Sequence, residues 1–168
     1  MTTASANPKM EEIRRRVASA YRAYTQLIDD QLTTLDPAKL YQPPEPTEWT
    51  IMENLAHVRE IMPYWAGQIE QLVATPRQKF GRTQKDEDRL RAIDEHRFDS
   101  LEQARAALPG SYARLEEVLR KLTDRDLALT GSHSTFGERT LDWFIDEFVT
   151  RHLEGHVEQL QHCLAALQ

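Results

Sequence analysis

The sequence predicts an all-α protein that folds as a four-helix bundle. Four long segments place apolar residues three and four positions apart, the spacing of one helix face, at about 9–35, 50–74, 100–122 and 141–166. Connections rich in proline and turn residues separate them, and no segment alternates like a half-buried strand. A chain of 168 residues is long enough for one domain. We expect a flexible tail over 1–8 and a single bundle domain over 9–168.

The first two helices are separated by a segment that excludes regular helix. Residues 36–49 contain four prolines, which lack an N–H and clash with the preceding turn. The second helix begins at Thr50, which forms the capping-box pattern with Glu53. Pro63 interrupts this helix, so we expect either a kink just beyond His57 or two shorter helices that meet at a bend.

The second half of the chain likewise consists of connections followed by predicted helices. Residues 75–99 form a long connection with a short helix at about 87–97. Ser100 caps the third long helix, which Pro109-Gly110 should kink or split. A turn-rich loop over 123–140 leads to the last helix.

Composition and charge exclude several classes of function. The formal net charge of −6 argues against a nucleic-acid-binding surface, which needs concentrated positive charge. No apolar run is long enough to cross a bilayer, so we expect no membrane partner. The first residues lack the pattern of a secretion signal, and the single cysteine, Cys163, suits a reducing compartment. We therefore expect a cytoplasmic protein.

One connecting segment, RQKFGRTQKDEDRLR at 77–91, is rich in arginine and lysine interleaved with acidic residues. We interpret it first as a solvated connection. The alternative is a binding rim for an acidic small molecule.

Two histidines stand one turn apart on the last helix, at His152 and His156. With about 100° per residue, both fall in the apolar arc of the helical wheel, so both imidazoles face the core. Each buried ring nitrogen left unpaired costs about 1–3 kcal/mol. One metal ion satisfies a nitrogen of each ring, and the spacing lets both rings reach it. The alternative is a pair of core histidines bonded to backbone or side-chain groups.

His57 is the candidate third ligand. It lies on the second helix at the edge of the apolar arc, where a residue can face a space between helices. The alternative is a boundary histidine, half in solvent and paired with Glu53 or Glu60. The remaining histidines lie in connections or on the polar face of the last helix: His96, His133 and His162.

Several motifs resemble the DinB/YfiT-like superfamily. WTIMENLAHV at 49–58 is similar to its first signature, and RHLEGHVEQLQ at 151–161 to its C-terminal HxxxH. FGR at 80–82 and GERT-x-x-W at 137–143 also resemble the family, so the resemblance spans nearly the whole chain. It implies a four-helix bundle with a three-histidine site for a divalent metal, nickel or zinc, and the matching ligands are His57, His152 and His156.

The resemblance also implies a class of reaction. Known activities of the family use low-molecular-weight thiols, as in bacillithiol S-transferases and mycothiol-dependent maleylpyruvate isomerase. Other members are described as metal-dependent hydrolases, and many have no established reaction. A homodimer also fits the family, although the sequence shows no interface. The partners that we expect are a small-molecule thiol and an electrophile.

Three histidines leave open positions on a metal, which is typical of catalytic sites. We expect the metal to hold a thiol cosubstrate as thiolate, which attacks an electrophilic small molecule. The first alternative is hydrolysis by a metal-bound water, with Glu53 or Glu60 as the base. The second is a non-catalytic bundle that binds a metal or ligand. Whether the protein is an enzyme stays open at this point, as do the metal and the substrates.

A few further residues have two interpretations. Gln159 falls on the histidine face of the last helix, and we interpret it as a polar residue at a helix–helix seam, with a role in holding water or substrate as the alternative. Tyr64 has the same two interpretations. The tryptophans are interpreted as walls of the core or of a pocket: Trp49, Trp65 and Trp143.

Overall fold

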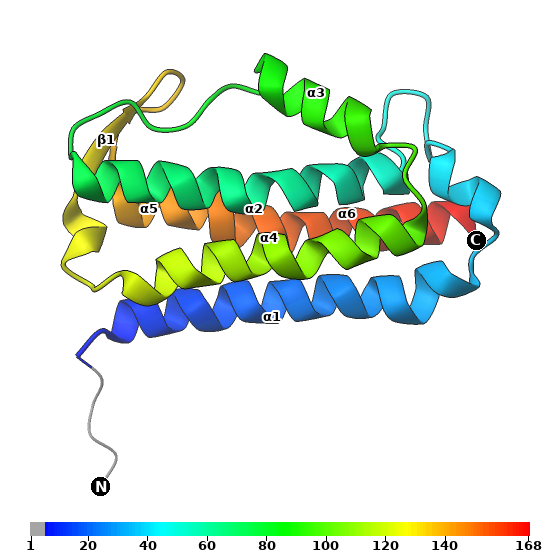
Figure 1. Ribbon diagram of the computed structural model, residues 1–168, viewed down its shortest axis with the longest axis horizontal. Helices are drawn as coiled ribbons and strands as arrows, with labels where there is room; N and C mark the ends of the chain where they lie inside the picture. Colours follow the sequence, from blue (N-terminus) through cyan, green and yellow to red (C-terminus); the bar gives the residue numbers. More distant parts are fainter. Residues whose placement is uncertain (1–5) are drawn as a thin grey trace, which may run out of the picture.

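Four long helices lie side by side in a computed structural model, which describes residues 6–168 (Figure 1). They are α1 (Pro8–Gln31), α2 (Ile51–Ala74), α4 (Leu101–Lys121) and α6 (Arg151–Leu167). α1 packs on α6 and α4, and α2 packs on α4 and α6, so the four enclose one core. This confirms the predicted bundle. The predicted flexible tail over 1–8 lies mostly outside the described residues, and α1 already begins at Pro8.

The directions of the helices explain the long connection after α2. In Figure 1, α1 and α6 run one way and α2 and α4 run the other way. Because α2 and α4 are parallel neighbours, the chain must travel back along the bundle between them. Residues 75–100 make this return, and α3 (Glu87–His96), the short helix predicted there, packs on α2.

Side-chain caps fix where these helices begin. The Thr50 hydroxyl accepts a hydrogen bond from the Glu53 N–H (3.0 Å), and the Glu53 carboxylate accepts one from the Thr50 N–H (2.9 Å). Ser100 and Gln103 form a second capping box at the start of α4. Both predicted caps are confirmed.

Pro63 and Pro109 lie inside continuous helices, so the alternative in which each proline splits its helix is wrong, while a kink at each proline stays a prediction. Both prolines lie on exposed faces, where the carbonyl that loses its N–H partner can bond to water. The adjacent residues Met62 and Leu108 are buried, and their packing holds each helix against the core.

The loop predicted at 123–140 contains secondary structure that the sequence did not reveal. After a short turn, η3 (Asp126–Ala128), the strands β1 (Thr130–His133) and β2 (Gly137–Thr140) form an antiparallel hairpin. The connection after α2 joins it, since the Ser132 N–H donates to Gln78 O and the Phe80 N–H donates to Ser132 O, both at 2.9 Å. Two strands of four residues, rich in glycine, serine and threonine, carry no apolar alternation that would have indicated them.

The predicted last helix is not regular throughout. A short α5 (Leu141–Ile145) gives way to a π-helical turn, η4 (Asp146–Thr150), directly before α6 and His152. A π turn contains an extra residue relative to an α turn and is frequent at functional sites. No residue type marks such a turn, so a pattern of helical period missed it.

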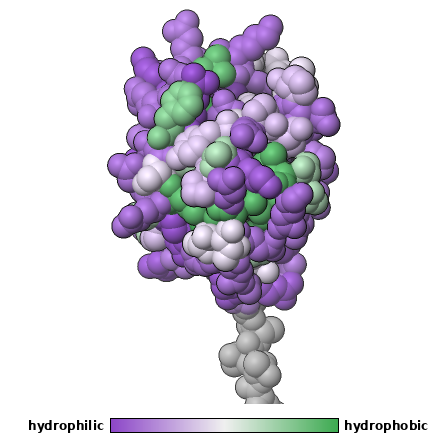
Figure 2. All heavy atoms as spheres, turned by 90° about the vertical axis from the view of Figure 1, so that its right-hand side faces the viewer, coloured by the Kyte–Doolittle hydropathy of each residue, from purple (hydrophilic) through white to green (hydrophobic). Residues whose placement is uncertain are grey.

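Two 3-10 turns close the end of the bundle where α1 ends and α2 begins: η1 (Leu32–Thr34) and η2 (Pro37–Tyr41). Leu32 and Leu40 are buried there. Figure 2 looks onto the end where α6 also finishes and shows apolar side chains gathered in the middle of a mostly hydrophilic surface. Among the described residues, no helix combines the length and apolar character that a membrane span requires.

Candidate metal centre

Three histidines from two helices meet inside the bundle. His57 comes from α2, and His152 and His156 come from α6. One ring nitrogen from each lies within 4.8 Å of the other two. The Nε2 atoms of His57 and His152 are 3.4 Å apart. These are the three residues that the sequence indicated, and their binding of a metal stays a prediction.

The packing of α2 on α6 buries this cluster. His57 is only 2% exposed, so the interpretation as a boundary histidine half in solvent is wrong. Trp49, directly before α2, packs edge-on against the His57 ring with 5.0 Å between centroids and shields it from water. On α6, the expected core face is confirmed, since Leu160 and Cys163 are buried with His156.

The tautomer of His156 follows from its neighbours. Its Nδ1 lies 3.0 Å from Oε1 of Gln159, which can only accept, and 3.3 Å from the Asn54 amide nitrogen, which can only donate. The shorter contact is a hydrogen bond only when Nδ1 carries the proton and donates to Gln159. The same Oε1 accepts from the Asn54 amide (2.8 Å), and the Tyr24 hydroxyl donates to Asn54 Oδ1 (2.5 Å). The lone pair of His156 is therefore on Nε2, a buried atom with no partner. Gln159 lies at the seam between helices, as interpreted, and also fixes a site histidine.

A carboxylate lies near the outer nitrogen of His57, where His156 has an amide. His57 Nδ1 lies 3.9 Å from Glu60 Oε2, too far for a hydrogen bond, and both atoms are buried without a hydrogen-bond partner. Glu60 also forms an ion pair with Arg82. Burial raises the pKa of Glu60, while the Arg82 charge opposes that rise. A carboxylate behind a histidine is a common arrangement at metal sites, where it fixes the ring and increases its basicity.

The Phe148 backbone, within η4, acts on the His152 ring and opposes the lowering of its pKa by burial. The three rings thus have different neighbours: the Gln159 amide beside His156, the Glu60 carboxylate near His57 and the π turn beside His152.

The electrostatics of the cluster favour neutral rings. Burial, and next the charges of the other two histidines, hold the pKa of His57 far below its ordinary value. Burial lowers the pKa of His152 to about 4 and, together with His152, that of His156 to about 3. Neutral imidazoles are the form that binds a metal.

The geometry fits a transition metal. Two nitrogens bound to one ion at about 2.0–2.1 Å with a tetrahedral angle lie about 3.4 Å apart. The observed separation of 3.4 Å between His57 Nε2 and His152 Nε2 agrees with this. An ion at the centre would also give His156 Nε2 the partner that it lacks.

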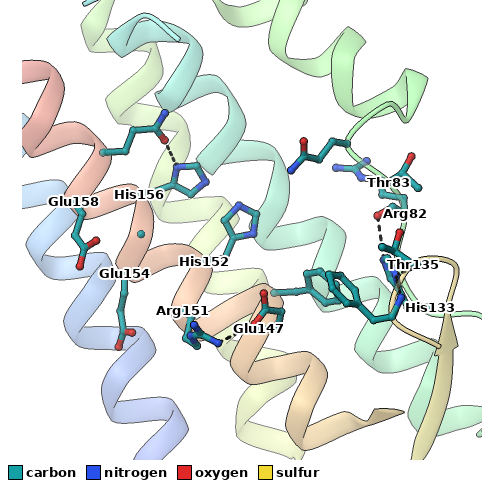
Figure 3. Close-up of a pocket in the computed structure, with 15 residues that line it drawn as sticks. Arg82, Thr83, His133, Thr135, Glu147, Arg151, His152, Glu154, His156 and Glu158 are labelled. Atoms are coloured by element: carbon teal, nitrogen blue, oxygen red, sulfur yellow. Dashed lines mark hydrogen bonds and ion pairs between the residues drawn. The ribbon is translucent and has the colours of Figure 1, made fainter. Parts of the chain in front are cut away.

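A cavity of about 780 Å³ opens beside the cluster (Figure 3), a size suited to a small molecule. His152 and His156 line it, whereas His57 does not. Phe136 and Phe148 supply an apolar wall. The remaining lining is polar: Arg82, Thr83, Gln84, His133, Thr135, Glu147, Arg151, Glu154, Glu158 and Gln159, with Gly155.

The segment at 77–91 corrects one expectation. The Arg82 side chain is only 10% exposed and lies 3.7 Å from the Tyr64 ring centroid, so this part is not a solvated connection. Gly81 makes the turn possible because its φ is +78° and an added Cβ would come within 3.0 Å of His133. Neither Arg82 nor His133 was predicted as a cavity residue, and only the FGR motif could have indicated Arg82.

The structure also places the aromatic residues that were interpreted from the sequence. Tyr64 lies under Arg82 and does not line the cavity. Trp65 is buried and stacks on Phe80 and Phe148, and Trp143 is partly buried against the core.

The chain matches the DinB superfamily over residues 20–160. It belongs to that superfamily. No curated protein sequence matches this DinB-superfamily chain.

Solved structures share the fold. The four-helix bundle protein TT2238 has a TM-score of 0.64 at 23% identity, over 92% of this chain and 99% of its own. YfiT from Bacillus subtilis, described as a probable metal-dependent hydrolase with an unusual four-helix bundle topology, has a TM-score of 0.67 at 14% identity, over 99% and 88%. The mycothiol-dependent maleylpyruvate isomerase has a TM-score of 0.61 at 15% identity, and the chain spans 60% of that longer protein.

Proposed function

We propose that this DinB-superfamily protein is an enzyme that uses a divalent transition metal to activate a low-molecular-weight thiol for transfer to an electrophilic small molecule. The observation that carries the proposal is the buried cluster of three neutral histidines beside a cavity of small-molecule size. His57, His152 and His156 would hold the metal. Nickel and zinc are the expected ions, since imidazole suits both.

When bound, a divalent metal supplies a Lewis acid that keeps a coordinating thiol in its thiolate form, which is the nucleophile. The chain supplies the rest of the site. Gln159 orients His156 through a hydrogen bond, and the Glu60 carboxylate lies near the outer nitrogen of His57. Phe136 and Phe148 form the apolar wall that would exclude water from an electrophile.

A thiol cosubstrate also suits the absence of a cysteine or serine nucleophile from the cavity lining. Among the residues that line the cavity, none is a cysteine or serine. Cys163 lies outside this lining, and burial raises the pKa of its thiol, which opposes formation of the thiolate.

Hydrolysis is the alternative, because YfiT is described as a probable metal-dependent hydrolase. The two bases considered for it fit poorly. Glu53 is engaged in the helix cap, and Glu60 faces the outer nitrogen of His57 and does not line the cavity.

The test is a conjugation assay on protein loaded with nickel or zinc. Monochlorobimane serves as the electrophile, and bacillithiol, mycothiol, glutathione and coenzyme A serve as thiols. We expect metal-dependent conjugation with at least one thiol, its loss in His152→Ala, and its retention in Gln161→Ala, which changes an exposed residue of the same helix outside the cavity.

The remaining outcomes separate the alternatives. Metal-dependent turnover of p-nitrophenyl acetate without any thiol would replace the proposal with hydrolysis. Tight metal retention with no turnover in either assay would instead indicate a non-catalytic metal-binding bundle.

A further inference from the structure

One cation beside the metal centre has no carboxylate in direct contact among the described residues, and Glu60 and Asp86 act on it only from a longer distance. Arg89 on α3 donates a hydrogen bond from Nη1 to Gln84 O (2.9 Å), and no carboxylate of the described residues lies within ion-pair distance of it. Its neighbours differ, since Arg82 pairs with Glu60 and Asp86. The Arg89 side chain is also partly buried, so water screens its charge incompletely.

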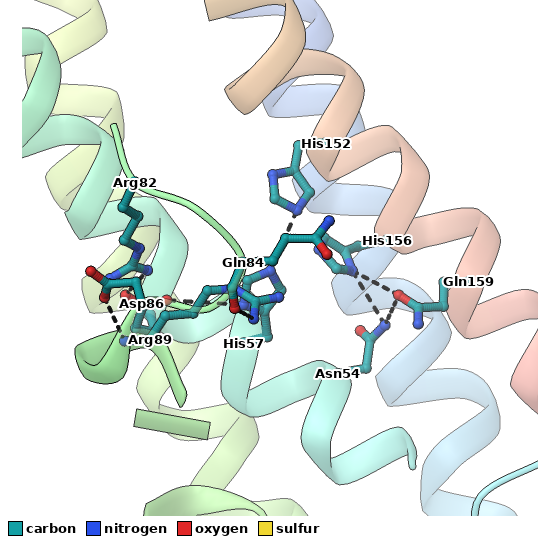
Figure 4. A network of polar contacts seen from close by, with 10 residues as sticks. Asn54, His57, Arg82, Gln84, Asp86, Arg89, His152, His156 and Gln159 are labelled. Atoms are coloured by element: carbon teal, nitrogen blue, oxygen red, sulfur yellow. Dashed lines mark hydrogen bonds and ion pairs between the residues drawn. The ribbon is translucent and has the colours of Figure 1, made fainter. Parts of the chain in front are cut away.

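This charge is directed toward the three histidines. The guanidinium lies 5.2 Å from the Trp49 ring centroid, and that ring contacts His57. The Arg89 charge contributes to the lowered pKa of each of the three histidines. Figure 4 shows Arg89 and Gln84 beside the cluster.

A second cavity, of about 440 Å³, lies in front of this guanidinium. Arg89 lines it, and Gln84 and Gln159 line both this cavity and the larger one. The two cavities therefore adjoin at these side chains, so a molecule bound at Arg89 lies next to the cavity that His152 and His156 line. Glu48, the carboxylate in the lining of the second cavity, is already bonded to His162 (3.2 Å).

A lone guanidinium next to a site for a divalent cation is electrostatically unfavourable unless an anion joins the two. A carboxylate fits better than a phosphate. Phosphate sites gather several donors, commonly at a free helix N-terminus, whereas the Asp86 carboxylate already caps the start of α3 by accepting from the Arg89 N–H (3.0 Å). The planar guanidinium instead matches one carboxylate with two parallel hydrogen bonds.

We propose that Arg89 determines substrate specificity by binding a carboxylate, so that the substrates of this site are carboxylate-bearing small molecules whose reactive group lies at the histidine centre. This inference deepens the proposed function and rests on a metal in that centre. It agrees with the alternative interpretation of the segment at 77–91, a binding rim for an acidic small molecule.

The test uses Co²⁺-loaded protein and two thiol probes that differ in one charge, mercaptopropionate and mercaptopropanol. The sulfur-to-cobalt charge-transfer band reports binding. We expect the carboxylate thiol to bind the wild type at least about 10-fold more tightly, the contribution of one charge-assisted hydrogen-bonded pair. In Arg89→Gln the preference should fall below about twofold. Arg91→Gln, which removes an exposed arginine of α3, should keep it.

Two results would overturn the inference: equal binding of both thiols by the wild type, or a preference that survives in Arg89→Gln at unchanged cobalt content. If neither thiol gives a band, thiol activation itself fails. Calorimetric titration of the same proteins with succinate and succinamide then decides the carboxylate site. A preference for succinate that Arg89→Gln loses supports the inference, and equal or absent binding refutes it.

Discussion

The two halves of the histidine cluster are built differently. In the α6 half, His152 and His156 stand one turn apart, and their neighbours are neutral: the Phe148 backbone and the Gln159 amide. In the α2 half, His57 faces Glu60, a carboxylate that Arg82 pairs with from the long connection. Local helix geometry thus places the first half, whereas the carboxylate near the second depends on an ion pair that is distant in sequence.

The two halves of the cluster therefore depend on different parts of the chain. The α6 half can form wherever one regular helix carries the two histidines. The α2 half needs the connection to fold back along the bundle, because Arg82 reaches Glu60 only from there. We therefore expect substitutions in the connection to act on the metal through His57.

The largest effect is expected from removing a ligand on either side. His152→Ala and His57→Ala should each weaken metal binding by more than about 100-fold, since even partners behind the ligands contribute 10–100-fold. Elemental analysis of protein purified without added metal, with competition by a chelator, measures this. His162→Ala is the control. If His57→Ala keeps its metal, the α6 half binds alone and the comparison fails.

The next largest effect is expected from the two residues that lie behind the histidine rings, Glu60 and Gln159. Glu60→Gln should weaken metal binding by about 10–100-fold, because it removes the carboxylate behind His57. Gln159→Leu should cost less, about 2–10-fold, because its hydrogen bond to His156 is neutral. Both are measured by chelator competition. Glu70→Gln, which removes an exposed α2 carboxylate paired with Arg114, should have no effect. Equal losses for Glu60→Gln and Gln159→Leu would contradict the distinction.

A third effect concerns the fold of the connection. Gly81→Ala should lower the free energy of unfolding by about 1–3 kcal/mol, because its φ of +78° strains any side chain and His133 crowds the new Cβ. Gly67→Ala, in α2 with open space around it, should raise that energy by about 0.5–1 kcal/mol. Urea unfolding measures both. A stable Gly81→Ala variant would show that the turn before Arg82 is not constrained.

The smallest effect is expected from pH. Ordinary histidines, with a pKa of about 6.5, would lose about 50-fold in metal affinity from pH 7.5 to 6.0 through three competing protonations. With the pKa of His152 at about 4 and of His156 at about 3, affinity should change less than about twofold over this range. Calorimetric titration at the two pH values checks it.

The same lowered pKa values determine whether the free energy of unfolding rises or falls with pH. In the metal-free protein, these histidines bind protons below about pH 6.5 when the chain is unfolded, whereas they stay neutral when they are buried in the folded chain. The free energy of unfolding should therefore fall as the pH drops from about 6.5 toward 4, the pKa of His152. A flat urea midpoint over that window would mean that the rings are not buried as described.

What the sequence predicted well depends on short-range regularity. The capping box at Thr50 and the core-facing pair on α6 follow from residues three and four apart. His57 was found because a motif and the helical wheel agreed. The Glu60–Arg82 pair was missed because the burial of two charged residues depends on how the connection folds back. The continuity of α2 through Pro63 likewise depends on packing of its buried face.

The π turn before α6 has a consequence for how this chain tolerates length changes. An α-helix rotates about 100° per residue, so the extra residue within Asp146–Thr150 sets the angular phase of everything that follows. Deleting a single residue there would let α5 and α6 merge into one unbroken spiral. Because the π turn fits its extra residue into about the rotation of one α turn, both imidazoles would stay directed at His57 after that deletion. If all the residues were kept and wound as a regular α-helix, both imidazoles would instead turn by about 100°, away from His57.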